Sequence, residues 1–250
     1  MALSRRDFVK LCSGTVAGFG VSQMFHPAIH EAFAQTLTGE RPPVFWVQGQ
    51  GCTGCSVTLL NSTHPSIADV LLKIISLEFH PTVMAAEGEG AYEHMMRVAE
   101  KFKGKFIFAV EGAVPVAHDG KCCVVAEADH HEVTMTEVTK VLAANAAAVL
   151  AVGTCAAYGG IPAGKGNETG AMGVSAFLKK EGIPAPVINI PGCPPHPDWI
   201  VGTIGLGLQA LATNTLGLLV KQGLDANGRP KAFYKNVHMN CPHLSAFEAG

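Results

Sequence analysis

The sequence predicts an α/β protein with a parallel sheet, and two observations support this fold class. Short apolar runs alternate with segments of helical spacing along the chain. Most of these runs end in loops rich in glycine, proline and functional side chains, as the ligand-binding strand ends of open parallel sheets do. The chain has 250 residues and is 48% hydrophobic, which allows a large buried core without a disulfide scaffold.

Each expected element follows from a local pattern. Apolar runs predict the main strands at 44–48, 106–110, 148–152 and 186–190. Two further strands are expected at 74–79 and, on an edge, at 122–126. Helical spacing predicts helices over 56–61, 67–76, 87–101, 133–147, 173–180 and 200–220. Gly182 is placed to end the fifth of these helices, and Asp198 is expected to cap the last one.

Residues 1–34 form an export signal that is separate from the fold. Residues 4–10 (SRRDFVK) match a twin-arginine pattern, and a modestly apolar stretch follows them. Residues 32–34 form an A-x-A cleavage site, so the mature chain is expected to start at Gln35. The twin-arginine route exports folded proteins, usually ones that acquire a cofactor in the cytoplasm. We therefore expect a periplasmic protein whose cysteines are occupied by metal before they meet an oxidising compartment.

Charge and hydropathy argue against two classes of partner. The net charge is −2 and no basic run stands out, which argues against nucleic acid. The longest apolar stretch after the signal, 200–220, contains threonine, glutamine and asparagine side chains. It lacks the unbroken apolar run of about 20 residues that a membrane span needs. We therefore predict a buried helix that ends near Gly223 and no transmembrane segment in this chain.

Four of the eight cysteines lie in glycine-rich turns that follow predicted strands, namely Cys52, Cys55, Cys155 and Cys193. Parallel strands would bring all four thiols to one edge of the sheet. The Cys52–Cys55 pair alone fits a redox dithiol, half a zinc site or a disulfide. Cys155 alone fits a small buried side chain. Taken as a set, the four cysteines favour a four-thiolate metal site.

The spacing of these cysteines bears on the kind of metal. Zinc and iron–sulfur clusters both accept four thiolates. Structural zinc sites usually show two close pairs, whereas here one pair is followed by two single cysteines, 100 and then 38 residues further on. A bulky cubane cluster fits this spread better. The neighbouring glycines leave room for it and offer backbone N–H groups to its sulfurs.

Three segments resemble the cysteine signatures of a known family. They are 46–57 (WVQGQGCTGCSV), 152–162 (VGTCAAYGGIP) and 189–199 (NIPGCPPHPDW). The family is the small subunit of nickel–iron hydrogenases, and the details are most similar to its selenium-containing branch. Residues 111–115 are similar to a further stretch of the family, and the leader fits as well.

The resemblance implies a flavodoxin-like fold over residues 35–222, with helices on both faces of the sheet. It implies that Cys52, Cys55, Cys155 and Cys193 bind one 4Fe–4S cluster, the proximal one. The hydrogen-splitting nickel–iron centre would lie on a separate large subunit, the partner in a heterodimer. As in an uptake-type hydrogenase, this chain would carry electrons away from that centre to a cytochrome or another redox carrier, in the reaction H2 ⇌ 2 H+ + 2 e−.

The end of the chain departs from the family pattern. Residues 223–250 resemble only the truncated start of a C-terminal iron–sulfur domain, which in the family holds two further clusters. His238 and Cys241 resemble half of the distal cluster site, and the other two ligands are missing. We expect either a fragment or a protein that has lost the outer clusters. His238 and Cys241 are then either metal ligands or part of an exposed tail.

Two pairs of potential ligands are expected to be structural. Cys122 and Cys123 are adjacent on an alternating run, so one would face inward and the other outward. His130 and His131 could bind metal, but they are expected in a polar loop before the next helix.

Two carboxylates, Glu87 and Glu111, lie near predicted strand ends. Each could serve in proton movement or could hydrogen-bond the backbone near the cluster. A structural role is expected for each.

Two alternative functions fit the same cysteines. One is a single-cluster electron-transfer subunit of a related respiratory complex, and the other is a zinc-stabilised exported binding protein without a redox role. The intact Cys52–Cys55 motif and the twin-arginine leader favour the hydrogenase over the first alternative. A colourless protein that contains zinc would favour the second.

Overall fold

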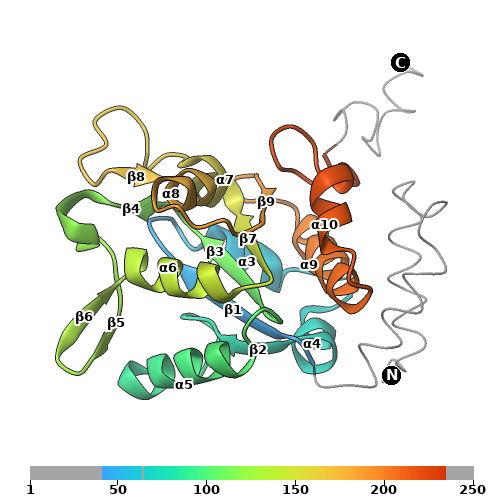
Figure 1. Ribbon diagram of the computed structural model, residues 1–250, viewed down its shortest axis with the longest axis horizontal. Helices are drawn as coiled ribbons and strands as arrows, with labels where there is room; N and C mark the ends of the chain where they lie inside the picture. Colours follow the sequence, from blue (N-terminus) through green and yellow to red (C-terminus); the bar gives the residue numbers. More distant parts are fainter. Residues whose placement is uncertain (1–40, 64, 235–250) are drawn as a thin grey trace.

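The computed structural model describes residues 41–63 and 65–234, and its centre is a five-stranded parallel sheet (Figure 1). The strands lie in the order β2-β1-β3-β7-β9, and every neighbouring pair is parallel. Their bounds are β1 Pro43–Gln48, β2 Ser76–Phe79, β3 Ile107–Glu111, β7 Ala148–Val152 and β9 Val187–Ile190. This is the flavodoxin-like order, in which the direction of winding reverses between β1 and β3. The predicted fold class is therefore confirmed.

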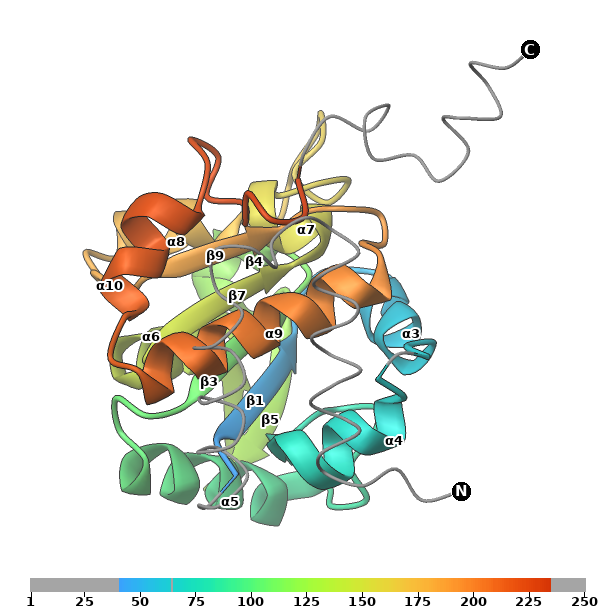
Figure 2. The same cartoon turned by 90° about the vertical axis from the view of Figure 1, so that its right-hand side faces the viewer.

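Helices cover both faces of the sheet because its main strands are apolar on both sides. One face packs on α5 (Gly88–Lys101), α6 (Met135–Asn145) and α8 (Val174–Lys180). The opposite face packs on α3 (Gly54–Leu60), α4 (Ile67–Asp69) and α9 (Pro197–Ala212). Figure 2 shows α9 lying across the strands. In β1, Phe45 faces the first group of helices and Trp46 faces the second. Burial on both faces explains why the main strands are nearly continuous apolar runs in the sequence and do not alternate.

Shorter elements complete the described part of the chain. The helix α7 (Gly153–Tyr158) follows β7 directly. Two small antiparallel pairs lie outside the main sheet. They are β4 (Val114–Pro115) with β8 (Ala171–Met172), and β5 (Val124–Ala128) with β6 (His131–Thr134). Single helical turns lie at Val70–Ile74, Ala117–Gly120 and Leu219–Gly223.

The helix predicted over 200–220 is interrupted. Helix α9 ends at Ala212, and a short α10 (Leu216–Leu218) continues into the turn that ends at Gly223. Asn214 between them adopts a left-handed conformation with φ of +54°, which a continuous helix does not allow. The Thr213 hydroxyl also bonds back to the carbonyl oxygen of Gln209. Within the described ranges, none of the helices combines the length and apolarity that crossing a membrane requires.

The cap of α9 differs from the prediction. The N-cap is His196 rather than Asp198, and its Nδ1 accepts a hydrogen bond from the backbone N–H of Asp198 at 3.3 Å. Pro197 takes the first helical position, where its fixed φ is favourable. Asp198 then lies within the first turn, where its negative charge interacts favourably with the positive end of the helix dipole.

The loop predicted at 130–131 is a hairpin turn. Asp129 and His130 have φ of +50° and +61°, as the two central residues of a type I′ turn do. The next residue opens β6, which pairs with β5. Helix α6 consequently begins two residues later than predicted, where Thr134 and Glu137 form a capping box.

The segment 224–234 lies along the edge strand β9. The backbone N–H of Asn189 donates to the carbonyl oxygen of Gly228 at 2.8 Å. The Tyr234 hydroxyl donates to the carbonyl oxygen of Pro191 at 2.7 Å. These bonds hold a segment that the sequence assigns to the start of a second domain against the loop that follows β9.

Candidate metal centre

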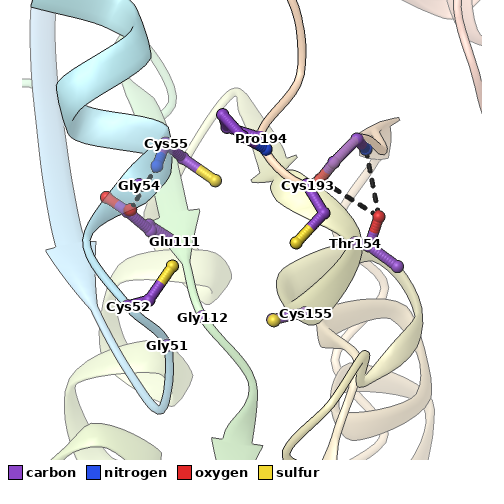
Figure 3. A pocket seen from close by; sticks show the side chains of 11 residues that line it. Gly51, Cys52, Gly54, Cys55, Glu111, Gly112, Thr154, Cys155, Cys193 and Pro194 are labelled. Carbon is purple, nitrogen blue, oxygen red and sulfur yellow. Dashed lines mark hydrogen bonds between the residues drawn. The ribbon is translucent and has the colours of Figure 1, made fainter.

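The four predicted cysteines line one pocket at the carboxyl edge of the sheet (Figure 3). Cys52 lies in the loop after β1, and Cys55 lies in the first turn of α3. Cys155 lies in α7, directly after β7, and Cys193 lies in the loop between β9 and α9. The four sulfurs point into the same hollow. The expectation that parallel strands gather these thiols at one edge is confirmed.

One buried carboxylate, Glu111 at the end of β3, is hydrogen-bonded to both β1 and the first turn of α3, and it is 3% exposed. Its Oε1 accepts the backbone N–H groups of Cys55 at 2.9 Å and of Ser56 at 3.2 Å. Its Oε2 accepts Trp46 Nε1 at 3.0 Å, Gln48 Nε2 at 3.1 Å and the Ser56 hydroxyl at 2.5 Å. Of the roles left open for Glu111, the structure supports a hydrogen bond to the backbone beside a cysteine.

A buried histidine lies behind this carboxylate. His80 follows β2, is 1% exposed and stacks on Trp46 with ring centroids 5.4 Å apart. Its Nδ1 accepts the backbone N–H of Thr82, so Nε2 carries the proton and donates to Ser56 Oγ at 3.2 Å. Burial lowers the pKa of His80. The nearby Glu111 carboxylate raises it by a smaller amount, and the net pKa is about 4. His80 is therefore neutral at neutral pH.

The first turn of α7 and the loop after β9 are joined by neutral hydrogen bonds. The backbone N–H and the hydroxyl of Thr154 both contact the carbonyl oxygen of Gly192, at 2.9 and 3.1 Å. The backbone N–H of Gly192 approaches the same hydroxyl at 3.1 Å. This clasp holds Cys155 and Cys193, which follow Thr154 and Gly192 directly, on neighbouring strand ends.

Two glycines let the backbone approach the thiols closely. Gly153 has φ of +86°, and a Cβ at this position would collide with Cys55 Sγ. Gly160 has φ of +54°, and a Cβ there would lie 2.8 Å from Cys155 Sγ. Both the left-handed conformation and the missing side chain are needed at these positions.

The environment favours protonated thiols in the absence of metal. Burial raises the pKa of the Cys55 thiol above its usual value, and the Glu111 carboxylate raises it further. Burial also raises the pKa of Cys155, although the backbone N–H of Ile161 opposes this effect. Since thiolates are the ligands, metal binding must displace these protons.

The arrangement of donors fits a cluster better than a single ion. No three histidine, cysteine, aspartate or glutamate side chains within residues 41–63 and 65–234 are arranged to hold one metal ion. The four thiols instead surround a hollow of about 300 Å³, counting its part open to solvent. In a 4Fe–4S cluster each cysteine binds a different iron, so four sulfurs need not converge on one point.

Other residues singled out from the sequence lie elsewhere. Neither Cys122 nor Cys123 lines the pocket, and both precede β5, which begins at Val124 rather than at 122. The Cys123 thiol packs against the core and approaches the carbonyl oxygen of Gln48 at 4.0 Å. Glu87 is exposed at the start of α5 and makes no capping bond.

The remaining predicted ligands fall outside the described residues. His238 and Cys241 lie in 235–250, and the export signal lies in 1–40. Their predicted roles therefore stay predictions.

Sequence analysis missed the polar group behind the cysteines. Ser56 follows a cysteine of the first signature, and His80 follows β2 at the carboxyl edge of the sheet. A polar residue directly after a predicted strand is the signal that identifies His80, since strand ends in parallel sheets carry functional side chains.

Comparisons with known proteins agree with this geometry. A family described as "NADH ubiquinone oxidoreductase, 20 Kd subunit" matches residues 52–206. The chain is 53% identical over 254 aligned residues to the periplasmic [NiFeSe] hydrogenase small subunit of Desulfomicrobium baculatum, covering 99% of this chain and 79% of that relative. The chain belongs to the hydrogenase small-subunit family. Like other members, it is a subunit of an oxidoreductase.

Other members of the hydrogenase small-subunit family are similar over most of the chain. The Hydrogenase-2 small chain of Escherichia coli K12 is 36% identical, and the match covers 99% of this chain and 62% of that one. The structure of the [NiFeSe] hydrogenase from Desulfovibrio vulgaris Hildenborough aligns with a TM-score of 0.79 at 66% identity, covering 86% of this chain and 77% of that one. Both relatives above 50% identity named here come from [NiFeSe] hydrogenases, so the predicted similarity to that branch is confirmed.

Proposed function

We propose that this chain is the electron-transfer small subunit of a periplasmic hydrogenase and binds a proximal 4Fe–4S cluster through Cys52, Cys55, Cys155 and Cys193. The observation that carries the proposal is the meeting of four thiols from three distant loops in one pocket. Membership of the hydrogenase small-subunit family supports it independently.

The residues of this chain would hold and insulate the cluster, which supplies a one-electron redox centre when bound. The four thiolates would each bind one iron. Gly153 and Gly160 let the backbone approach the ligands without a side chain between them.

The proposed partner is a large subunit that carries the nickel–iron centre where hydrogen is split. Large apolar side chains are exposed on the elements that carry the cysteines. Val57 on α3 is 55% exposed, and Ile161, shortly after α7, is 83% exposed. Apolar groups exposed beside the cysteine pocket favour a protein partner at this edge. Electrons would then pass to a cytochrome or another redox carrier.

The proposed location is the periplasm, reached by the twin-arginine route. Relatives from Desulfomicrobium baculatum and Solidesulfovibrio fructosivorans are named periplasmic subunits. The arginine pair and the A-x-A site of residues 1–34 support the same route. Such a route would let the cluster be inserted before export.

The test is purification of the chain together with its large subunit, followed by iron and acid-labile sulfide analysis and electron paramagnetic resonance. We expect a 4Fe–4S signal that appears when hydrogen is supplied and disappears when an oxidised carrier is added. A colourless, zinc-containing protein would contradict the cluster. A cluster that chemical reductants reduce but hydrogen does not would contradict the hydrogenase.

A second candidate is favoured by one observation. The family description that matches residues 52–206 names an NADH–ubiquinone oxidoreductase subunit, which suggests a single-cluster subunit of a respiratory complex. The same hydrogen-dependent reduction experiment separates the two. Reduction by hydrogen supports the hydrogenase, and reduction only through a quinone-linked partner supports the second candidate.

A further inference from the structure

We propose that Glu111 is a positioning residue whose buried, fixed negative charge holds the Cys55 loop and lowers the reduction potential of the cluster in this pocket. This inference rests on the proposed function, because it concerns the cluster that Cys52, Cys55, Cys155 and Cys193 would bind. Glu111 would bind no iron and would exchange no electron. One electron enters the cluster and the same electron leaves, while the carboxylate keeps its charge.

The hydrogen-bond partners of Glu111 are those of an ionised carboxylate. All five contacts come from groups that can donate, and four of them are N–H groups. Two of these donors are backbone amides and one is an indole, which cannot accept instead. In a neutral acid or an amide, one hydrogen of the side chain itself would point at one of these donors, and that hydrogen bond would be lost. The donors therefore match a group that only accepts hydrogen bonds.

No cation compensates this charge within the part of the chain that the structure describes. None of its ion pairs includes Glu111. The basic side chain His80 is linked to the carboxylate through a hydrogen bond to Ser56 Oγ. His80 is neutral at neutral pH for the reason given above. The carboxylate charge is therefore stabilised by N–H and O–H dipoles and is not neutralised by a cation.

The carboxylate lies where this charge acts on the cluster. Glu111 lines the pocket together with all four cysteines. Its Oε1 is one hydrogen bond from the backbone of Cys55. Adding an electron makes a cluster more negative, and a negative charge in a poorly screened site disfavours this step. The same hydrogen bond also fixes the first turn of α3, so the residue acts on geometry as well as on potential.

The experiment uses the complex of this chain with its large subunit. The cluster potential is measured by redox titration followed by electron paramagnetic resonance, with iron content measured in parallel. The variants are Glu111→Gln, which removes the charge at nearly constant shape, and Glu111→Asp, which keeps the charge. Glu132→Gln serves as the control, because Glu132 is an exposed carboxylate on the β5–β6 hairpin.

We expect Glu111→Gln to keep its cluster and to shift the reduction potential upward by more than the control does. Glu111→Asp should stay nearer the wild-type potential. A Glu111→Gln complex that loads fully and titrates at the wild-type potential overturns the proposal. A wild-type complex that holds no four-iron cluster overturns the proposed function instead, and the two failures are thus distinguishable.

If Glu111→Gln does not bind the cluster, two other variants still test the proposal. If Glu111→Asp loads, a wild-type potential supports the proposal and a raised one overturns it. If neither variant loads, Gln48→Leu removes one donor while leaving the carboxylate in place. We expect this variant to load with a potential at or below that of the wild type, because the remaining charge is less neutralised. A raised potential in Gln48→Leu overturns the proposal.

Discussion

The cysteine edge of the sheet has two halves that are held together by different forces. In the half that follows β1 and β3, one buried carboxylate accepts hydrogen bonds from five donors on β1 and α3. In the half that follows β7 and β9, Thr154 and Gly192 form a neutral clasp. Both halves present two cysteines to the same pocket. Charge is thus fixed on one side of the pocket only.

This difference has energetic consequences. Removing a partner from the charged half leaves a buried charge or several donors unpaired, which costs more than the loss of an ordinary hydrogen bond. Removing a partner from the neutral half costs about 1 kcal/mol for each bond lost. We therefore expect substitutions of hydrogen-bonding residues to cost more stability in the charged half than in the neutral half. Loss of a cysteine ligand should have the same effect in either half.

The largest effect is expected from loss of a ligand, which tests whether the two halves form one site. We predict that Cys193→Ser loses or converts the cluster, because three thiolates cannot hold all four irons. Cys122→Ser should retain it, since Cys122 does not line the pocket. Iron content and the visible absorption spectrum of the purified complex check both. An equal loss of iron in the two variants would contradict the ligand assignment.

The second effect is expected where the halves touch. In Gly153→Ala the new Cβ would collide with Cys55 Sγ, and the residue would have to keep φ of +86°. We predict a loss of about 2–4 kcal/mol in the free energy of unfolding together with reduced iron content. Urea denaturation and iron analysis measure these.

Gly166→Ala is the matched control for this substitution. Gly166 has φ of +90°, and nothing lies within 4 Å of a Cβ at that position. It should show the backbone strain alone and keep its iron. If the two variants lose the same stability and the same iron, contact between the halves is not the cause.

The third prediction concerns the buried His80 in the charged half and the pH dependence of stability. The pKa of His80 is about 4 in the folded protein, below its usual value near 6.5. As pH falls from about 6.5 to 4, the unfolded chain takes up a proton that the folded protein does not. Stability should therefore decrease across this window by up to about 3 kcal/mol and then decrease no further from this source.

Replacement of His80 tests this pH dependence. We expect His80→Gln to flatten the fall in the free energy of unfolding between pH 6.5 and 4. His130→Asn should leave the fall unchanged, because His130 is exposed in the hairpin turn and asparagine tolerates its positive φ. An identical pH profile in His80→Gln and the wild type would show that His80 is not the source.

The smallest effect is expected in the neutral half. Thr154→Val keeps the side-chain shape but removes the hydroxyl that contacts Gly192. We predict a loss of about 1–2 kcal/mol in the free energy of unfolding, with the cluster retained. Thr213→Val, which removes an exposed hydroxyl, should cost less. A loss of iron as complete as in Cys193→Ser would mean that the clasp matters far more than its two contacts indicate.

Much of the fold could be predicted because both faces of the sheet are buried. The strands at 44–48, 106–110, 148–152 and 186–190 are mostly apolar runs, and each lies within one residue of the observed strand. The signal fails where local geometry decides. A left-handed Asn214 interrupts the helix expected over 200–220, and apolar periodicity carries no information about it.

The candidate site was predictable only in part. Cysteines after strand ends predict that four thiols gather, because parallel strands end at one edge. The sequence left several roles open for Glu111 and missed Ser56 and His80, since their hydrogen bonds join residues far apart in the chain. Asp198 was the expected cap by residue type, yet the helix begins at Pro197 and the cap is His196, two positions earlier.

The sequence by itself determined the burial pattern, the positions of the strands and the four cysteines that follow them, because these depend on residue type and local spacing. Only the tertiary structure decided what holds those cysteines in place. The Glu111 carboxylate and the Thr154–Gly192 clasp act across separate loops. Their contacts exist only once the chain has wound β1, β3, β7 and β9 into a single parallel sheet with all its carboxyl ends on one side.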